Sequence, residues 1–299
     1  RRCVYETDME GEEHQTPVVD RDNLQPGATV AGPAIIREQT ATTIVEPGWQ
    51  AELTPKGHLI LIRVVAMQRA FAVGTDCDPV MLEVFNNLFM TIAEQMGVTL
   101  ENTAFSVNIK ERLDFSCAIF DPDGMLVANA PHIPIHLGSM SESVRTVLTS
   151  NAGTMKPGDV FVVNAPYNGG THLPDVTVIT PIFDAAGQDI LFYVASRGHH
   201  SDIGGITPGS MPPDSKHVQE EGILFDNLML VDGGTFLEDK LRKHLADHPY
   251  PARNPEHNIA DLKAQIAAGE KGVQEVHAMI DQFGVDVVHA YMKLSLIHI

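Results

Sequence analysis

The sequence lacks the features of several broad classes of protein. Its 299 residues include 20 Lys and Arg against 39 Asp and Glu, which gives a net charge of −19. So acidic a surface argues against nucleic acid or an anionic membrane as a partner. No apolar run approaches the ~20 residues of a membrane span, and the N-terminal residues contain no signal-peptide core. We therefore expect a cytoplasmic globular protein.

Cysteine is also scarce. Cys3, Cys77 and Cys117 are odd in number and widely spaced, so they form neither a disulfide framework nor a C-x-x-C site. Cys117, within DFSCAIF, is predicted to be a small core residue. The sequence contains no internal repeat, no Walker A loop, no G-x-G-x-x-G and no G-x-S-x-G. Nothing in these 299 residues therefore predicts an ATP site or a serine-hydrolase elbow.

What the sequence does contain divides into two regions. Residues 1–65 alternate turn formers with short β-branched runs, which predicts a small β-rich module with Trp49 as a packing anchor. Residues 66–77 are interpreted as a linker. Residues 78–299 mix helical and strand patterns, so the predicted fold class is α+β, with a larger sheet-plus-helix domain after the module.

Two long segments have the apolar spacing of helices. Asp78-Pro79 is typical of a helix start, and the helix is predicted to end at Gly97. Residues 258–284 repeat the pattern, and Gly269 and Gly272 interrupt it. That interruption predicts an antiparallel helix pair.

A shorter helix is predicted over residues 142–148, capped by Ser139 or Ser141. Pro134 interrupts the H-x-x-x-H of His132 and His136, so these two imidazoles are not expected to share a helix face. His136 would then lie in a loop at the helix N-terminus, which is a natural position for binding anions.

Strands are predicted from β-branched and aromatic runs at 160–163, 176–182 and 190–195. Residues 107–130 are interpreted as two further strands joined by a turn at 121–124. Residues 206–222 are too rich in Pro and Gly for regular structure, and long loops of this kind are usually functional or mobile.

Polar residues stand at the ends of these strands. His172 and Asp175 lie in the break between the first two, and His199, His200 and Asp202 follow the third. Because adjacent strands place their ends near one another, the two groups can converge. Two imidazoles and a carboxylate suit a divalent metal such as Zn or Mn. The alternative is that they are turn residues that hydrogen-bond exposed backbone.

From Asp78 onward the chain resembles the N-terminal half of hydantoinase B / 5-oxoprolinase proteins. The resemblance rests on blocks in the family's order: DPVMLEVFNNLF, ERLDFSCAIFD, PHIPIHLGSM, NGGTHLPDVTV, ASRGHHSDIGG, GSMPPDS and RNPEHNIADLKAQIAA. Residues 1–65, with GPAIIREQTATTIVEPGW, look like the C-terminal end of hydantoinase A. The chain begins without Met and ends in KLSLIHI without a helix stop signal. We therefore expect a fragment of a fused protein, with 78–299 truncated and the final residues not native.

The resemblance implies a two-part reaction. The hydantoinase A-like portion, actin-like in fold, would use ATP-Mg to phosphorylate the amide oxygen of 5-oxoproline, and the B portion would open the lactam to glutamate. In related ketone carboxylases the H-x-x-D motif and a downstream His place a metal, which carries over onto His172, Asp175 and His199. His200 and Asp202 rank lower. A bound metal would polarise a carbonyl.

Other candidate residues have two interpretations each. Arg112 and Asp114 either bind the substrate carboxylate and order a ligand, or form a salt bridge. His136 is a candidate for holding a phosphorylated intermediate. Arg197 is either a strand-end charge pair or a substrate clamp.

Three hypotheses about function remain open. The first is an ATP-dependent cyclic-amide hydrolase, and the second is an ATP-dependent ketone carboxylase or a hydantoinase. The third is an acidic module that only docks the ATPase portion. Expected partners are that portion and a small cyclic amide. We also expect a homo-oligomer, and no activity from these residues alone.

Overall fold

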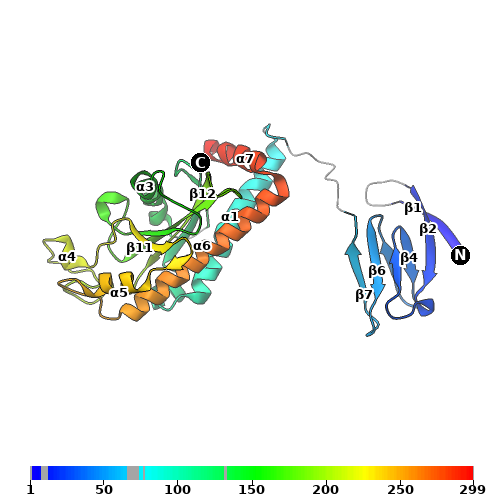
Figure 1. The fold of residues 1–299 in the computed structure, drawn as a ribbon, viewed down its shortest axis with the longest axis horizontal. Helices are drawn as coiled ribbons and strands as arrows, with labels where there is room; N and C mark the ends of the chain where they lie inside the picture. Colours follow the sequence, from blue (N-terminus) through cyan, green and yellow to red (C-terminus); the bar gives the residue numbers. More distant parts are fainter. Residues whose placement is uncertain (1, 8–12, 66–73, 77, 131–132, 299) are drawn as a thin grey trace. The chain divides into compact units, whose positions relative to one another are not determined.

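The computed structural model describes all residues except 1, 8–12, 66–73, 77, 131–132 and 299. The chain divides into two compact units, Arg1–Ala72 and Val73–Ile299 (Figure 1). Most of the predicted linker 66–77 lies outside the described residues. The predicted α+β class is confirmed, because strands dominate the first unit and the second combines a sheet with helices.

The first unit contains two small sheets, with strand orders β1-β2-β4-β5 and β3-β6-β7. Ala34, Ile36, Val45 and Ala51 form its buried core, and Trp49 packs against that core as predicted. The strands are β1 (Arg2–Thr7), β2 (Glu13–Asp20), β3 (Thr29–Ala31), β4 (Ala34–Arg37), β5 (Thr42–Val45), β6 (Trp49–Leu53) and β7 (Leu59–Arg63), and a short 3-10 helix spans Arg21–Asn23.

The second unit is built on an antiparallel seven-stranded sheet of order β14-β13-β10-β11-β12-β8-β9. The three strands predicted beside the polar residues form, and two of them are longer than predicted. β11 starts at Asp175, and β12 continues to His199. The strands are β8 (Phe115–Phe120), β9 (Leu126–Asn129), β10 (Val160–Val163), β11 (Asp175–Phe183), β12 (Ile190–His199), β13 (Leu228–Asp232) and β14 (Thr235–Phe236).

Helices cover both faces of this sheet. The helices are α1 (Pro79–Thr103), α2 (Val107–Lys110), α3 (Pro134–Ser150), α4 (Val218–Glu221), α5 (Glu238–Ala246), α6 (Pro255–Phe283) and α7 (Val285–His298), with a 3-10 turn at Pro166–Asn168. Long helices α1 and α6 lie side by side on one face (Figure 1). Helix α3 covers the opposite face.

Alternation along the strands assigns each side chain to one face. Phe161, Ile179 and Tyr193 pack with α3, and we call this side the α3 face. Val178 and Val194, at the intervening positions, pack with the helices of the other side, which we call the α6 face. Cys117 is buried there, as predicted for a core residue.

The two glycine-based helix boundaries were wrong. Helix α1 continues through Gly97 to Thr103, and α6 is one helix through Gly269 and Gly272 rather than a pair. A Cβ at Gly272 would lie 2.6 Å from Sδ of Met96, and one at Gly269 would lie 2.9 Å from Oγ1 of Thr180. The α6 glycines therefore allow the helix to approach its neighbours closely, and packing outweighs the ~1 kcal/mol that Gly costs in a helix.

The start of α3 also differs from the prediction. The helix begins at Pro134, so His136 lies in its first turn rather than in a loop capped by Ser139 or Ser141. Proline is favoured at the first helical position because its missing N–H has no partner there in any case. Val107–Lys110, interpreted from the sequence as strand, forms the short helix α2.

Substituting Gly272 by Leu tests the close packing of α6. We expect the substitution to lower stability by ~2 kcal/mol, because overpacking a tight contact forces neighbours to move. For a domain of this size that corresponds to a fall in Tm of ~4–8 °C. The matched control is Gly138→Leu on α3, where the described residues leave open space around the added carbon. Equal Tm changes in the two variants would contradict the packing argument.

A histidine and aspartate cluster as candidate metal centre

Strand pairing brings the two predicted groups of polar residues together. Strands β11 and β12 pair antiparallel, and Asp175 is directly opposite His199 in the register. His172 lies in the turn before β11, where its carbonyl accepts a hydrogen bond from the backbone N–H of Asp175. Both strand residues project on the α3 face, because they stand at the same alternate positions as Ile179 and Tyr193. The carboxylate of Asp175 and the imidazole of His199 are thus neighbours on adjacent strands, and the turn before β11 contributes the imidazole of His172.

The three side chains converge on one point. Nδ1 of His172 lies 2.9 Å from Oδ2 of Asp175, and Nδ1 of His199 lies 3.1 Å from Oδ1 of the same carboxylate. The two imidazole rings are 5.0 Å apart between centroids. Each residue offers a ligand atom, and these atoms all lie within 4.8 Å of one another. The donor set fits a Zn or Mn ion, because imidazole nitrogen and carboxylate oxygen both suit these metals.

Asp175 is the electrostatic centre of the cluster. Its side chain is only 5% exposed, and such burial by itself disfavours the carboxylate. Hydrogen bonds from His136, His172 and His199 outweigh that effect and hold the pKa of Asp175 far below its usual range. The hydrogen bond with Asp175 in turn raises the pKa of His172. The centre of the cluster therefore carries a fixed negative charge.

Two further predicted residues border the cluster. Nε2 of His136 lies 3.5 Å from Oδ2 of Asp175 and 3.9 Å from Oδ1 of Asp114. Oδ2 of Asp114 is 3.8 Å from Nδ1 of His199, whose backbone N–H donates to the Asp114 carbonyl. Asp114 precedes β8 directly, which explains its position beside the end of β12. Three imidazoles and two carboxylates thus share one site.

Exposure of the side chains shows which side of the cluster faces solvent. His136 is 3% exposed and forms the inner wall, whereas His172 and Asp114 are 39% and 36% exposed. The cluster is therefore open to solvent on the side of His172 and Asp114. The buried imidazole lies behind it.

Two hydroxyl groups that no sequence motif indicates also belong to the site. Oγ1 of Thr171 donates to Oδ2 of Asp175 at 2.8 Å, and Oγ of Ser116 lies 3.1 Å from Nδ1 of His136. Ser116 stands on β8 opposite Arg197 of β12. The alternation of β8 would have placed Ser116 on the face of Ala118 and Phe120, but hydroxyls in strands are too common to stand out without the register.

His200 and Asp202 do not join the cluster. His200 is fully buried on the α6 face, where its ring nitrogens contact Gln265 at 3.1 Å and Asn258 at 3.2 Å. Burial lowers its pKa. Asp202 instead pairs with Arg253 at 2.7 Å and accepts backbone N–H groups of its own loop. Adjacent residues at a strand end point to opposite faces, so only one of the two neighbouring histidines can reach the carboxylate.

The two predicted arginines have different surroundings. Arg112 lies exposed in the turn after α2, two residues before Asp114, and its guanidinium has no ion-pair partner among the described residues. Arg197 is completely buried beneath the cluster and hydrogen-bonds only to neutral oxygens. Burial lowers the pKa of Arg197 to about 10, and the charge of Asp175 partly opposes this change.

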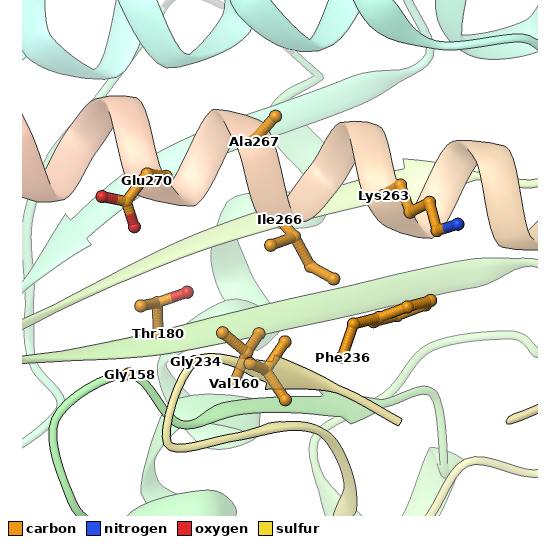
Figure 2. Close-up of a pocket in the computed structure, with 10 residues that line it drawn as sticks. Gly158, Val160, Thr180, Gly234, Phe236, Lys263, Ile266, Ala267 and Glu270 are labelled. Atoms are coloured by element: carbon orange, nitrogen blue, oxygen red, sulfur yellow. The ribbon is translucent and has the colours of Figure 1, made fainter. Parts of the chain in front are cut away.

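A separate pocket opens on the α6 face. Its volume is about 400 Å³, and it lies between α6, which contributes Lys263, Ile266 and Glu270, and strand residues that include Val160 and Thr180 (Figure 2). No member of the cluster lines it. The residues of the cluster lie on the α3 face, so the pocket does not belong to the candidate metal centre.

Comparison with known proteins identifies the family. Residues 78–297 match the Hydantoinase B/oxoprolinase family, and residues 1–61 match the Hydantoinase/oxoprolinase C-terminal domain. The chain belongs to the hydantoinase B/oxoprolinase family, and the resemblance inferred from its sequence blocks is confirmed. Within the part of the chain that the structure describes, none of the helices combines the length and the hydrophobicity of a membrane span.

Among curated relatives, 5-oxoprolinase of Dictyostelium discoideum is 49% identical over 278 residues, which covers 93% of this chain and 21% of that protein. 5-Oxoprolinase 1 of Arabidopsis thaliana is 46% identical over 300 residues and is covered to 23%. The chain therefore spans between a fifth and a quarter of the length of these relatives.

Two solved structures share the fold. The ATP-dependent caprolactamase from Pseudomonas jessenii superimposes with a TM-score of 0.66 and 29% identity, covering 73% of this chain and 37% of that one. Nucleotide-free acetone carboxylase also gives a TM-score of 0.66 over 73% of this chain and 28% of that one. Its identity is 18%, so this second likeness concerns the fold alone.

Alanine at His200 and at His199 should affect stability differently. His200→Ala leaves the buried Oε1 of Gln265 without its partner, which costs ~1–3 kcal/mol, and removes one of the two contacts of the Asn258 side-chain nitrogen. His199→Ala removes a partly exposed ring, and Asp175 keeps its other partners. In protein treated with chelator, His200→Ala should therefore lower Tm more. The reverse order would mean that the two side chains are assigned to the wrong faces.

Proposed function

We propose that this chain carries the ring-opening part of an ATP-dependent hydrolase of cyclic amides, with 5-oxoproline as the substrate. The observation that carries the proposal is the cluster of His172, Asp175 and His199 at the open end of two paired strands. The names of the most similar relatives, 5-oxoprolinases, support this substrate. Water would add to the amide carbon of the phosphorylated lactam and the ring C–N bond would break. A second water would hydrolyse the resulting acyl phosphate, so that glutamate and inorganic phosphate form.

The three residues of the cluster would hold one divalent metal. Asp175 supplies a negative charge at neutral pH, because its pKa lies far below the usual range. The two imidazoles complete a donor set that leaves the solvent side open. When bound, such an ion polarises a carbonyl oxygen and so stabilises the charge that develops as the ring opens.

Neighbouring residues would orient the substrate. Asp114 stands at the exposed edge of the cluster, where it can order a water molecule or a ligand. His136, fixed through Ser116, directs Nε2 toward the carboxylates and is proposed to contact the phosphorylated intermediate. Arg112 is proposed to bind the substrate carboxylate, since its exposed guanidinium is free among the described residues.

ATP-Mg would bind elsewhere in the full-length protein. The described residues include no glycine-rich phosphate loop, and the structural neighbour of 29% identity is an ATP-dependent caprolactamase. A hydantoinase A-like portion upstream is the proposed source of the activated amide, because residues 1–61 match the C-terminal domain of that family. A cytoplasmic location and a homo-oligomer remain predictions.

A ketone carboxylase is the second candidate, because acetone carboxylase shares the fold. The two reactions differ in their products. A 5-oxoprolinase releases glutamate without using bicarbonate, whereas a carboxylase incorporates bicarbonate. A docking module without catalysis would have no need for a bound ion.

The metal is tested by elemental analysis of the full-length protein. We expect about one Zn or Mn per chain. Replacing His172 or His199 by Ala should weaken binding by more than the roughly 10- to 100-fold that loss of an outer hydrogen-bond partner costs. Glu270→Gln, at the separate pocket on the α6 face, should keep the metal. A wild-type protein without metal after reconstitution would contradict the proposal.

The reaction is tested with His172→Ala in the full-length protein. Glutamate release from 5-oxoproline should fall on the order of 100-fold or more, because removal of one group that stabilises a developing oxyanion has this effect. Some ATP hydrolysis should remain, because the nucleotide is proposed to bind in another portion. Glu270→Gln should retain both activities. Unchanged glutamate release in His172→Ala would sink the proposed role of the cluster.

A further inference from the structure

The contacts of Arg197 fit neither of the two roles predicted for it from the sequence, a substrate clamp or a strand-end charge pair. The residue stands on β12, two positions before His199, and its side chain is completely inaccessible to solvent. It therefore cannot clamp a substrate. Among the described residues it also lacks an ion-pair partner, so it is not a strand-end charge pair.

The guanidinium hydrogen-bonds to three separate segments. Nε donates to Oγ1 of Thr177 on β11 at 2.7 Å. One terminal nitrogen donates to Oγ of Ser143 on α3 at 2.9 Å and to the Gly169 carbonyl at 3.0 Å. The other donates to Oγ of Ser139 and, at 3.4 Å, to the carbonyl of His136. One buried side chain thus joins β11, α3 and the loop after β10.

These segments carry the residues of the cluster. Thr177 is two positions after Asp175 on the same face of β11, and the His136 carbonyl belongs to the inner-wall histidine itself. Gly169 lies three residues before His172. Arg197 is therefore connected to every chain segment that contributes a side chain next to Asp175, apart from the segment of Asp114.

The loop that carries His172 is packed closely at Gly169. Its φ of +85° favours glycine, and a Cβ there would lie 2.2 Å from the backbone nitrogen of Ser143. Oγ of Ser143 also donates to the Gly169 carbonyl at 2.6 Å. On the other side of the loop, the buried amide of Asn164 donates to the carbonyl of Leu173 at 2.8 Å. The loop is thus held from both sides, with Arg197 beneath it.

We propose that Arg197 is a positioning residue that holds the loop of His172 and the first turn of α3 in register with β11. This inference rests on the proposed metal-dependent function. Arginine suits the task because its planar fork of five N–H donors reaches several acceptors at once, whereas lysine offers a single point charge. A buried cation among neutral acceptors is costly. An apolar residue would fill the same space without linking the three segments.

The experiment measures metal affinity in the full-length protein with Arg197→Lys and Arg197→Met. Zn²⁺ affinity is determined by competition with a chelator, and the ligand geometry is followed by the d–d absorption of the Co²⁺-substituted protein. We expect both variants to bind Zn²⁺ on the order of 10-fold or more weakly, with an altered Co²⁺ spectrum. Ser143→Ala removes one acceptor of Arg197 and the hydrogen bond that Ser143 donates to Gly169, but no charge, and should show a smaller effect in the same direction.

Arg253→Lys is the matched control. Arg253 also joins a loop through several bonds, to Asp202 at 2.7 Å and to the Gly205 carbonyl at 2.8 Å, but it lies away from the cluster. We expect this variant to keep the wild-type affinity and spectrum. Tm, measured with and without metal, separates a general loss of stability from a change at the site.

Each outcome decides the proposal. If the Arg197 variants lower Tm but bind Zn²⁺ as the wild type does, with the same Co²⁺ spectrum, Arg197 is only structural and the inference is overturned. If Arg197→Met fails to fold, the folded Arg197→Lys and Ser143→Ala variants decide by the same criteria. If the wild-type protein itself binds no metal, the proposed function fails, and this inference fails with it.

Discussion

The pairing of β11 with β12 is the constraint on which the rest of the site depends. Antiparallel pairing places Asp175 opposite His199 with both side chains on one face. A shift of one residue would move every side chain of β12 to the other face. His199 would then lie among the core residues beneath α6, and His200 would face the carboxylate. Hydrophobic side chains prevent the shift, because Tyr193 and Ala195 fill the space under α3 while Phe192 and Val194 pack on the opposite side. The packing of the core therefore determines which of two neighbouring histidines reaches the site.

The second constraint is electrostatic. A buried carboxylate is unfavourable unless it is paired, and Asp175 is surrounded by three imidazoles and one hydroxyl. Such a concentration of donors around one carboxylate exceeds what a turn needs for its own backbone hydrogen bonds. The charge of Arg197 lies behind the same carboxylate without touching it. The arrangement holds a negative centre in place while leaving His172 and Asp114 accessible, which is the combination expected where a cation and a small molecule meet.

The sequence predicted the sheet and the central residues of the site better than it predicted helix boundaries. Short β-branched runs between turn residues, such as Val160–Val163, indicate strands that are buried on both faces. Helix ends were misjudged at Gly97 and Gly272 because glycine was interpreted by local propensity. At Gly269 and Gly272 the absence of a side chain instead allows a close tertiary contact, which no single segment reveals. The predicted start of α3 was wrong for a different reason. Pro134 was interpreted as an interruption, although proline at the first helical position is favourable.

The roles of His200, Ser116 and Arg197 could not be predicted from the sequence alone. Their roles depend on which face of a strand they occupy. At the end of a strand, the face cannot be assigned until the pairing register is known. His200 is as conspicuous in the sequence as His199, yet it belongs to a buried polar network in which Gln265 donates to the carbonyls of Val176 and Ser196. That network joins α6 to the two strands on the α6 face. On the α3 face, Arg197 joins the same strands to α3 and its neighbouring loop. The pair of strands is therefore fixed on both faces at the end that carries Asp175 and His199. Polar strand ends fray easily when they have no such support. The positions of Asp175 and His199 therefore depend on residues outside the cluster.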